Sequence, residues 1–92
     1  MERIRFNKQF IYDFLSETGC IDCGIKNPIV LEFDHMSSKI ECISKMVNNG
    51  ESLLKLKKEI SKCVVRCANC HRIKTAKDFN WYAGLITRVY SV

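Results

Sequence analysis

Long hydrophobic runs are missing from this sequence. Its apolar stretches are short and interrupted by charged residues, whereas a helix that crosses a bilayer needs about 20 consecutive apolar residues. The N-terminal segment MERIRFNKQF contains neither an apolar stretch of signal-peptide length nor a small-residue cleavage site. These absences argue against membrane insertion and secretion, and they predict a cytoplasmic protein.

Internal repeats, linkers and low-complexity tracts are missing too, which predicts one domain over residues 1–92. A domain of this size buries only a modest apolar core, so a cross-link would add useful stability. The six cysteines could provide one. The net charge of +5, from 15 Lys and Arg against 10 Asp and Glu, is compatible with an acidic polymer as partner, but an ordinary basic surface explains it equally well.

Hydrophobic periodicity predicts a mixed α+β fold. Apolar residues recur at helical spacing over residues 7–17 and again over residues 51–62, where they form one face of a basic helix. Between these helices, apolar and polar residues alternate over residues 29–35, as in a strand with one buried face. Residues 63–66 are predicted to be a second extended segment, and a helix follows from CANCH to about Lys77.

Two segments are less regular. Residues 36–45 are predicted to be a polar loop, followed by a short helical turn through Met46 and a break at Asn48-Asn49-Gly50. The tail from Phe79 to Val92 contains many aromatic and aliphatic residues. We expect this tail to fold back over the core, with self-association through it as the alternative.

Four of the six cysteines form two C-x-x-C pairs, Cys20 with Cys23 and Cys67 with Cys70. In each pair a turn lets two thiolates converge on one cation, and two such turns complete a tetrahedral shell. A closed shell of four sulfurs leaves no position for water or substrate. The spacing therefore predicts one zinc ion with a structural role.

Other interpretations of the cysteines have less support from the sequence. Disulfides are the rival, but two short C-x-x-C pairs without a secretory signal suit a metal better. Cys42 and Cys63 are left over, and we interpret them as small hydrophobic residues rather than nucleophiles. His71 follows Cys70 directly and is an alternative zinc ligand.

The chain has only two histidines, and both lie beside landmarks of the predicted fold. His35 follows Asp34 at the end of the first strand, and His71 begins the helix that leaves the second cysteine pair. A zinc ion that joins the two pairs would stack this strand against residues 64–66. The zinc would thereby bring one carboxylate and two imidazoles close together.

Taken together, these segments resemble the HNH family of ββα-metal endonucleases, in particular its small zinc-bound members. Their pattern is C-x-x-C, an apolar strand ending in Asp-His or His-His, and C-x-x-C-H. The matching segments are CIDCG, LEFDH, EISKC and CANCHRIKTA, at residues 20–24, 31–35, 59–63 and 67–76. The resemblance implies a small α+β, zinc-stapled ββα-metal domain with an N-terminal helix and an additional amphipathic helix.

The resemblance also implies a function, that of a metal-dependent DNA endonuclease or nickase whose product carries a 5′-phosphate. It makes His35 the general base that activates a water, since an imidazole can accept a proton at neutral pH. It makes Asp34 and His71 the ligands of a catalytic divalent cation, Mg²⁺ or Mn²⁺, with Ni²⁺ or Zn²⁺ as alternatives. Such a cation would stabilise charge on the phosphate and on the leaving 3′ oxygen.

One position departs from the family pattern. The central asparagine of the motif usually lies five residues before the first cysteine of the second pair, where this chain has Lys62. That asparagine helps to hold the loop or to orient the base or the metal. Either Lys62, Asn69 or a loop residue takes over the role of this asparagine, or the nuclease activity is weak or absent.

Basic side chains in the second half of the chain predict sequence-independent phosphate contacts, from Arg72 and Lys74 beside His71 and from Lys62 and Arg66. The expected partner is DNA, with RNA as the alternative, and no membrane. The small size suits a bacteriophage or mobile-element gene, and a phage gene would place the protein in the cytoplasm of a bacterial host. Three functions stay open: the endonuclease, a non-catalytic zinc module that binds nucleic acid or a protein on the same scaffold, and a structural or inhibitory protein that acts through the aromatic tail.

Overall fold

A computed structural model describes residues 2–86 and residue 88. Within them the chain forms, in order, α1 (Glu2–Thr18), the 3-10 turn η1 (Pro28–Val30), β1 (Leu31–His35), α2 (Ile43–Asn48), α3 (Leu53–Ile60), β2 (Cys63–Cys67) and α4 (Ala68–Asp78). The predicted α+β class is confirmed. None of the described helices is both long enough and apolar enough to cross a membrane.

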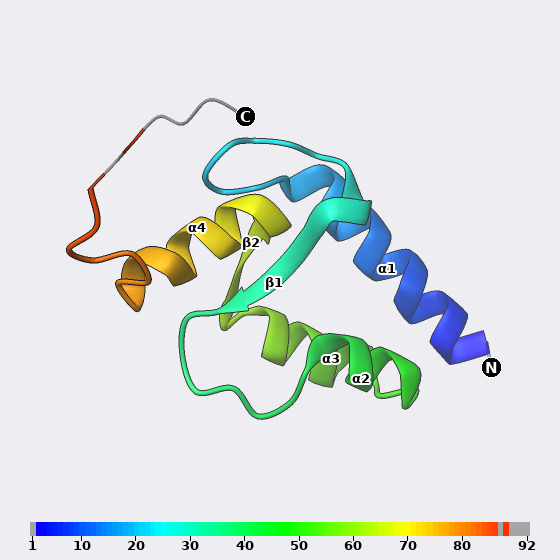
Figure 1. Cartoon of the computed structure of the whole chain (residues 1–92). Helices are drawn as coiled ribbons and strands as arrows, with labels where there is room; N and C mark the ends of the chain where they lie inside the picture. Colours follow the sequence, from blue (N-terminus) through cyan, green and yellow to red (C-terminus); the bar gives the residue numbers. More distant parts are fainter. Residues whose placement is uncertain (1, 87, 89–92) are drawn as a thin grey trace.

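The two strands form the centre of the fold. They pair antiparallel, with Leu31 opposite Cys67 and His35 opposite Cys63. Helix α4 continues directly from the end of β2. Helix α1 lies on the side of β1 opposite to α4, and α2 and α3 lie near the end of the sheet where β1 ends and β2 begins (Figure 1). A two-stranded sheet is marginal without further packing, so the helices around it are part of its stability.

Two clusters of buried side chains make the core. One lies where α1 meets the strands, and the other lies between α2 and α3. The first contains Leu15, Cys20, Leu31, Val65 and Cys67, and the second contains Ile43, Met46, Val47, Leu56 and Ile60. Phe14 and Phe33 pack against both clusters, with their ring centroids 5.9 Å apart, so the two clusters are continuous.

Gly19 ends helix α1, as its position in the sequence predicts. Its φ of +71° lies in the left-handed region, which glycine adopts without steric cost. A Cβ at this position would come within 3.0 Å of the Lys26 side chain. The chain can therefore reverse here and present Cys20 to the strands.

The elements differ from the predictions mainly at their boundaries. Helix α1 begins at Glu2 rather than Asn7. Strand β1 begins at Leu31 rather than Ile29, because Pro28 and the side chain of Asn27, which accepts from the Ile29 amide, form the η1 turn first. Ile29 is consequently 84% exposed rather than buried on the strand.

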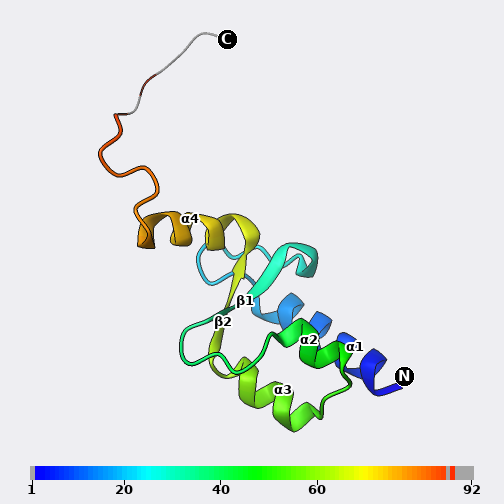
Figure 2. The same ribbon diagram turned by 60° about the horizontal axis from the view of Figure 1, so that its bottom comes forward.

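The expectation that the tail folds back over the core is wrong for the residues that the structure describes. Phe79, Tyr82, Leu85 and Ile86 are 71–75% exposed, and the chain runs away from the helices after α4 (Figure 2). The physical reason is that α4 itself projects from the body of the fold and contains no buried residue, so the chain that continues it has no core beneath it. Val89 and Tyr90 lie outside the described residues, and self-association through the tail stays a prediction.

Candidate functional site

The four predicted cysteines converge on one point. The sulfurs of Cys20, Cys23, Cys67 and Cys70 all lie within 4.8 Å of one another, and the part of the chain that the structure describes contains no other such group of three or more ligand side chains. The sulfurs of Cys23 and Cys67 are 3.8 Å apart. Sulfurs held tetrahedrally at a Zn–S distance of about 2.3 Å would be about 3.8 Å apart. This cysteine cluster can therefore hold a metal ion such as zinc.

Backbone hydrogen bonds fix both turns of the cysteine cluster. The amide of Gly24 donates to the carbonyl of Cys20 over 2.9 Å, and the amide of Ile21 donates to the carbonyl of Val65 in β2 over 2.8 Å. At the other turn, the sulfur of Cys67 accepts from the amide of Cys70 over 3.4 Å, which caps α4. The cluster thus joins the loop after α1 to the junction of β2 and α4.

The thiols of the cluster differ in acidity. Burial of Cys20 opposes its ionisation, but backbone hydrogen bonds from Cys67 and Cys23 outweigh it and lower the pKa of this thiol to about 6. Hydrogen bonding to the Cys67 side chain, together with burial, raises the pKa of Cys70 to about 12. The Cys20 thiol therefore loses its proton readily, whereas ionisation of the Cys70 thiol is unfavourable. A bound divalent cation would stabilise the thiolate form of both residues.

The remaining cysteines lie apart from the cluster. All six cysteines are free thiols. Cys63 is half-buried, and its sulfur donates to the carbonyl of Glu59 over 3.5 Å. Cys42 is exposed and bonds to Ser44 over 3.2 Å, so its interpretation as a buried hydrophobic residue is wrong.

A second group of side chains lies between β1 and α4. Nε2 of His71 is 3.6 Å from Oδ1 of Asp34, and Nδ1 of His71 is 2.7 Å from Oε1 of Glu32. Glu32 and Asp34 are two residues apart on β1, so both point to the same face of the strand. The predicted pairing of Asp34 with His71 therefore exists, and Glu32 adds a second carboxylate that the sequence analysis did not include.

Arg66 is held inside this group rather than exposed. Its Nε lies 2.7 Å from Oδ2 of Asp22, its Nη1 lies 2.5 Å from Oδ2 of Asp34, and its side chain is 12% exposed. Because Arg66 engages Oδ2 of Asp34, Oδ1 is the oxygen that faces His71. Two carboxylates thus compensate the positive charge that was predicted to contact phosphate.

His35 points in a different direction. Its side chain lies on the same face of β1 as Leu31 and Phe33, which pack in the core, and on the face opposite to Asp34. Nε2 of its ring lies 2.9 Å from Oε2 of Glu59 on α3, and its side chain is 13% exposed. The contacts of the structure therefore join Asp34 to His71 but place His35 at the end of β1 with a partner of its own.

Glu59 is the buried acid of this site. It is 4% exposed, Nζ of Lys62 donates to its Oε1 over 3.0 Å, and the amide of Ile40 donates to its Oε2 over 3.1 Å. Burial by itself would raise the pKa of this carboxyl, but Lys62, Ile40 and His35 together lower it to about 2. Glu59 is therefore ionised throughout the neutral range.

The other predicted phosphate-binding residues lie on α4. Lys74 is paired with Asp78 over 2.6 Å, whereas the guanidinium of Arg72 stacks over Trp81, 5.3 Å from the ring centroid. Arg72 and Trp81 line a surface hollow of about 410 Å³ together with His71, Glu32 and Asn69. The hollow gives His71 an open side toward solvent, with a guanidinium beside it.

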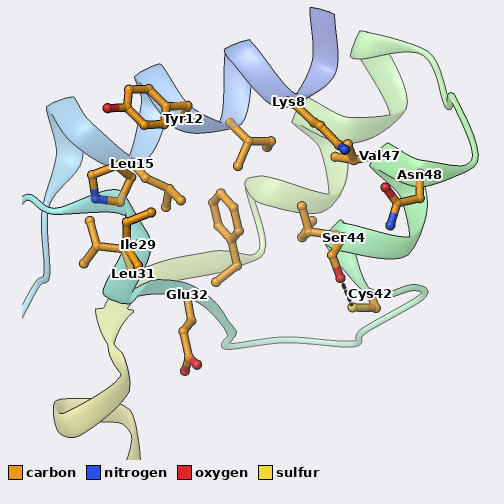
Figure 3. A pocket seen from close by; sticks show the side chains of 14 residues that line it. Lys8, Tyr12, Leu15, Ile29, Leu31, Glu32, Cys42, Ser44, Val47 and Asn48 are labelled. Carbon is orange, nitrogen blue, oxygen red and sulfur yellow. Dashed lines mark hydrogen bonds between the residues drawn. The ribbon is translucent and has the colours of Figure 1, made fainter. Parts of the chain in front are cut away.

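A larger cavity lies elsewhere. It has a volume of about 720 Å³ and lies between α1, the start of β1 and α2, with Tyr12, Leu15 and Val47 among its lining side chains (Figure 3). Its lining is mostly apolar and includes neither the cysteine cluster nor Asp34, His35 or His71. The cavity is therefore separate from the candidate site residues.

Comparison with known proteins adds no assignment. The chain matches no family model, no curated protein and no solved structure. The function must consequently be argued from the side chains themselves.

Proposed function

We propose that this chain is a zinc-stapled, metal-dependent endonuclease of the HNH type that hydrolyses DNA phosphodiester bonds. Asp34 and His71 would hold the catalytic divalent cation, Mg²⁺ or Mn²⁺, and His35 would act as general base. The cysteine cluster would hold one structural zinc ion. When bound, the catalytic cation would neutralise charge that develops on the phosphate and on the leaving oxygen.

The geometry of His71 carries the proposal. A histidine that binds a metal through one ring nitrogen commonly donates the N–H of the other to a carboxylate. His71 has this arrangement, with Nδ1 on Glu32 and Nε2 facing Oδ1 of Asp34 at 3.6 Å. An imidazole nitrogen and a carboxylate oxygen at that separation can both reach one ion of about 2.1 Å ligand distance. Glu32 would then fix the tautomer of His71.

His35 would accept the proton of the attacking water. Since it ends β1 and points away from Asp34, the scissile phosphate would lie across the end of the strand, between the two faces. The open hollow beside His71 contains Arg72, whose stacking on Trp81 leaves the edge of the guanidinium able to bind a phosphate oxygen. This arrangement supports backbone contacts without base readout.

A non-catalytic zinc module is the second candidate, and one observation favours it. Arg66 already pairs with Asp34, and Glu32 already forms a hydrogen bond with His71, so both site residues have partners without a second metal. In such a module the acidic and imidazole groups would only brace α4 against β1.

A plasmid-nicking assay with added Mg²⁺ or Mn²⁺ separates the two candidates. If the endonuclease proposal is correct, wild type nicks DNA. His35→Ala and His71→Ala should each nick at least about a hundredfold more slowly, a decrease of the size that general acid–base catalysis usually contributes. Lys45→Ala, which changes an exposed residue of α2, is the matched control and should retain the wild-type rate.

Binding measurements complete this test. If wild type and both histidine variants are equally inert while all bind DNA, the module is the correct function and the endonuclease is not. Nicking that persists undiminished in His35→Ala and His71→Ala would mean that the activity does not arise at this site.

A further inference from the structure

Glu59 and Lys62 form a partly buried ion pair at the end of β1. The side chains of both residues have low exposure, 5% for Glu59 and 20% for Lys62. A buried ion pair is seldom a net source of stability, because desolvating both charges offsets their attraction. Its contact with His35 therefore points to a role at the site.

The contacts of Glu59 reach three different parts of the molecule. Its Oε2 accepts from the backbone amide of Ile40, in the loop between β1 and α2, and also lies against the ring of His35. Its Oε1 accepts from Lys62. One carboxylate thus ties together the loop, the last residue of β1 and the residue before β2.

The chemistry of this contact selects one form of the His35 ring. An ionised carboxylate can only accept hydrogen bonds, so the ring nitrogen that faces Glu59 has to carry the hydrogen. That nitrogen is Nε2, at 2.9 Å. In the neutral ring Nδ1 is then the unprotonated nitrogen, and no hydrogen bond among residues 2–86 engages it.

We propose that Glu59, held by Lys62, is a positioning residue that fixes His35 as the Nε2–H tautomer and leaves Nδ1 as the proton acceptor. The same carboxylate anchors the loop through Ile40. The pair thereby holds the loop and orients His35 from the position, Lys62, where the chain departs from the family pattern. This inference rests on the proposed function for its catalytic meaning, but the tautomer itself can be measured without any activity.

Nitrogen-15 NMR of the imidazole rings tests the proposal. With only two histidines in the chain, His71→Ala assigns the His35 signals directly. At a pH where the shifts show a neutral ring, wild type should be predominantly Nε2–H. In Glu59→Gln the amide can accept from Nε2–H or donate to a bare Nε2, so the ratio of Nε2–H to Nδ1–H should fall roughly tenfold, as expected when a charged hydrogen bond becomes a neutral one.

Two further variants complete the design. Lys62→Met keeps the side-chain length but removes the ammonium, and it should shift the tautomer ratio in the same direction by less. Glu17→Gln, at an exposed residue of α1 outside the ion pairs of the described chain, should leave the ratio unchanged.

The outcomes are distinct. A wild-type His35 in the Nδ1–H form, or a ratio that Glu59→Gln leaves unchanged, overturns the proposal. Should Glu59→Gln fail to fold, the wild-type tautomer and the Lys62→Met shift still decide it. A confirmed Nε2–H tautomer combined with undiminished nicking by His35→Ala would retain the positioning of the ring and reject the proposed catalytic role of His35.

Discussion

At the residue scale, the carboxylate partners of the two histidines matter as much as the histidines. Glu32 contacts Nδ1 of His71, and Glu59 contacts Nε2 of His35. Each imidazole is therefore held in one orientation by an acid from a neighbouring element. The roles proposed for the two histidines require such an orientation.

Glu32→Gln should weaken binding of the divalent cation that we propose for Asp34 and His71. The loss of an outer-shell carboxylate commonly costs 10–100-fold in metal affinity, and we expect a decrease of about that size for Mn²⁺, followed by titration calorimetry of the zinc-loaded protein. Glu17→Gln should bind Mn²⁺ as wild type does. Equal Mn²⁺ affinity in wild type and Glu32→Gln would remove Glu32 from the metal site.

Acid should remove the stabilising contribution of Glu59. The folded-state pKa of this carboxyl is lowered to about 2 from an ordinary value of 4.5, so its contribution is complete above the ordinary value and is lost as pH falls from about 4.5 toward 2. The urea midpoint of wild type should exceed that of Glu59→Gln at pH 7, and the difference should shrink below pH 5. A difference that grows on acidification would contradict this sign.

These partners also show the limit of prediction from sequence. The spacing of the cysteines, and of Asp34, His35 and His71, carries enough information to expect a zinc cluster and the closeness of Asp34 to His71. Glu59 lies in a helix among lysines, where an acidic residue normally faces solvent, and only the register of α3 against β1 buries it. Glu32 could have been found, because it lies two residues before Asp34 and hence on the same face of the strand.

At the element scale, α3 connects the core to the site. Leu56 is fully buried in the second core cluster, whereas Leu54 in the same helix is 80% exposed. Glu59 and Ile60, which follow on the buried side, depend on the same packing. The amphipathic pattern predicted this helix correctly but did not indicate that Glu59 is buried beside Leu56 and Ile60.

Leu56→Ala should destabilise the fold by about 2–5 kcal/mol, the usual cost of truncating a fully buried leucine. Leu54→Ala is its matched control and should change the free energy of unfolding by less than about 0.5 kcal/mol. Urea denaturation of the two variants, followed by circular dichroism, makes the comparison. Equal effects would mean that α3 does not pack in this register.

The direction of α4 explains why the prediction for the tail was wrong. A stretch that contains Trp81, Tyr82, Leu85 and Ile86 has the composition of a core segment. Composition does not tell where the preceding helix points, and α4 leads away from both core clusters (Figure 2). Nearby apolar residues pack only when the chain geometry brings them to a surface.

At the scale of the whole molecule, the cysteine cluster should decide whether the chain folds. Small domains with a structural zinc ion commonly unfold without it, because binding energy is folding energy. Cys23→Ser should lose bound zinc and the cooperative thermal transition, and a strong chelator should do the same to wild type. Elemental analysis and thermal denaturation provide the two measurements.

Cys42→Ser is the control for this experiment, since Cys42 is exposed and lies outside the cluster. It should keep about one zinc per chain and the wild-type transition. If Cys23→Ser retains zinc and melts as wild type does, the cluster is not a structural metal site.

The long separation within the cysteine cluster has a consequence for biosynthesis. Cys20 and Cys23 precede β1, whereas Cys67 ends β2 and Cys70 lies in the first turn of α4. The sheet therefore cannot close before β2 has been synthesised, and the cysteine cluster cannot close before Cys70 has been. Contacts between residues so distant in sequence also form slowly. If the cluster is to hold a metal ion such as zinc, the thiols of Cys20 and Cys23 therefore have to stay reduced until Cys67 and Cys70 have been synthesised.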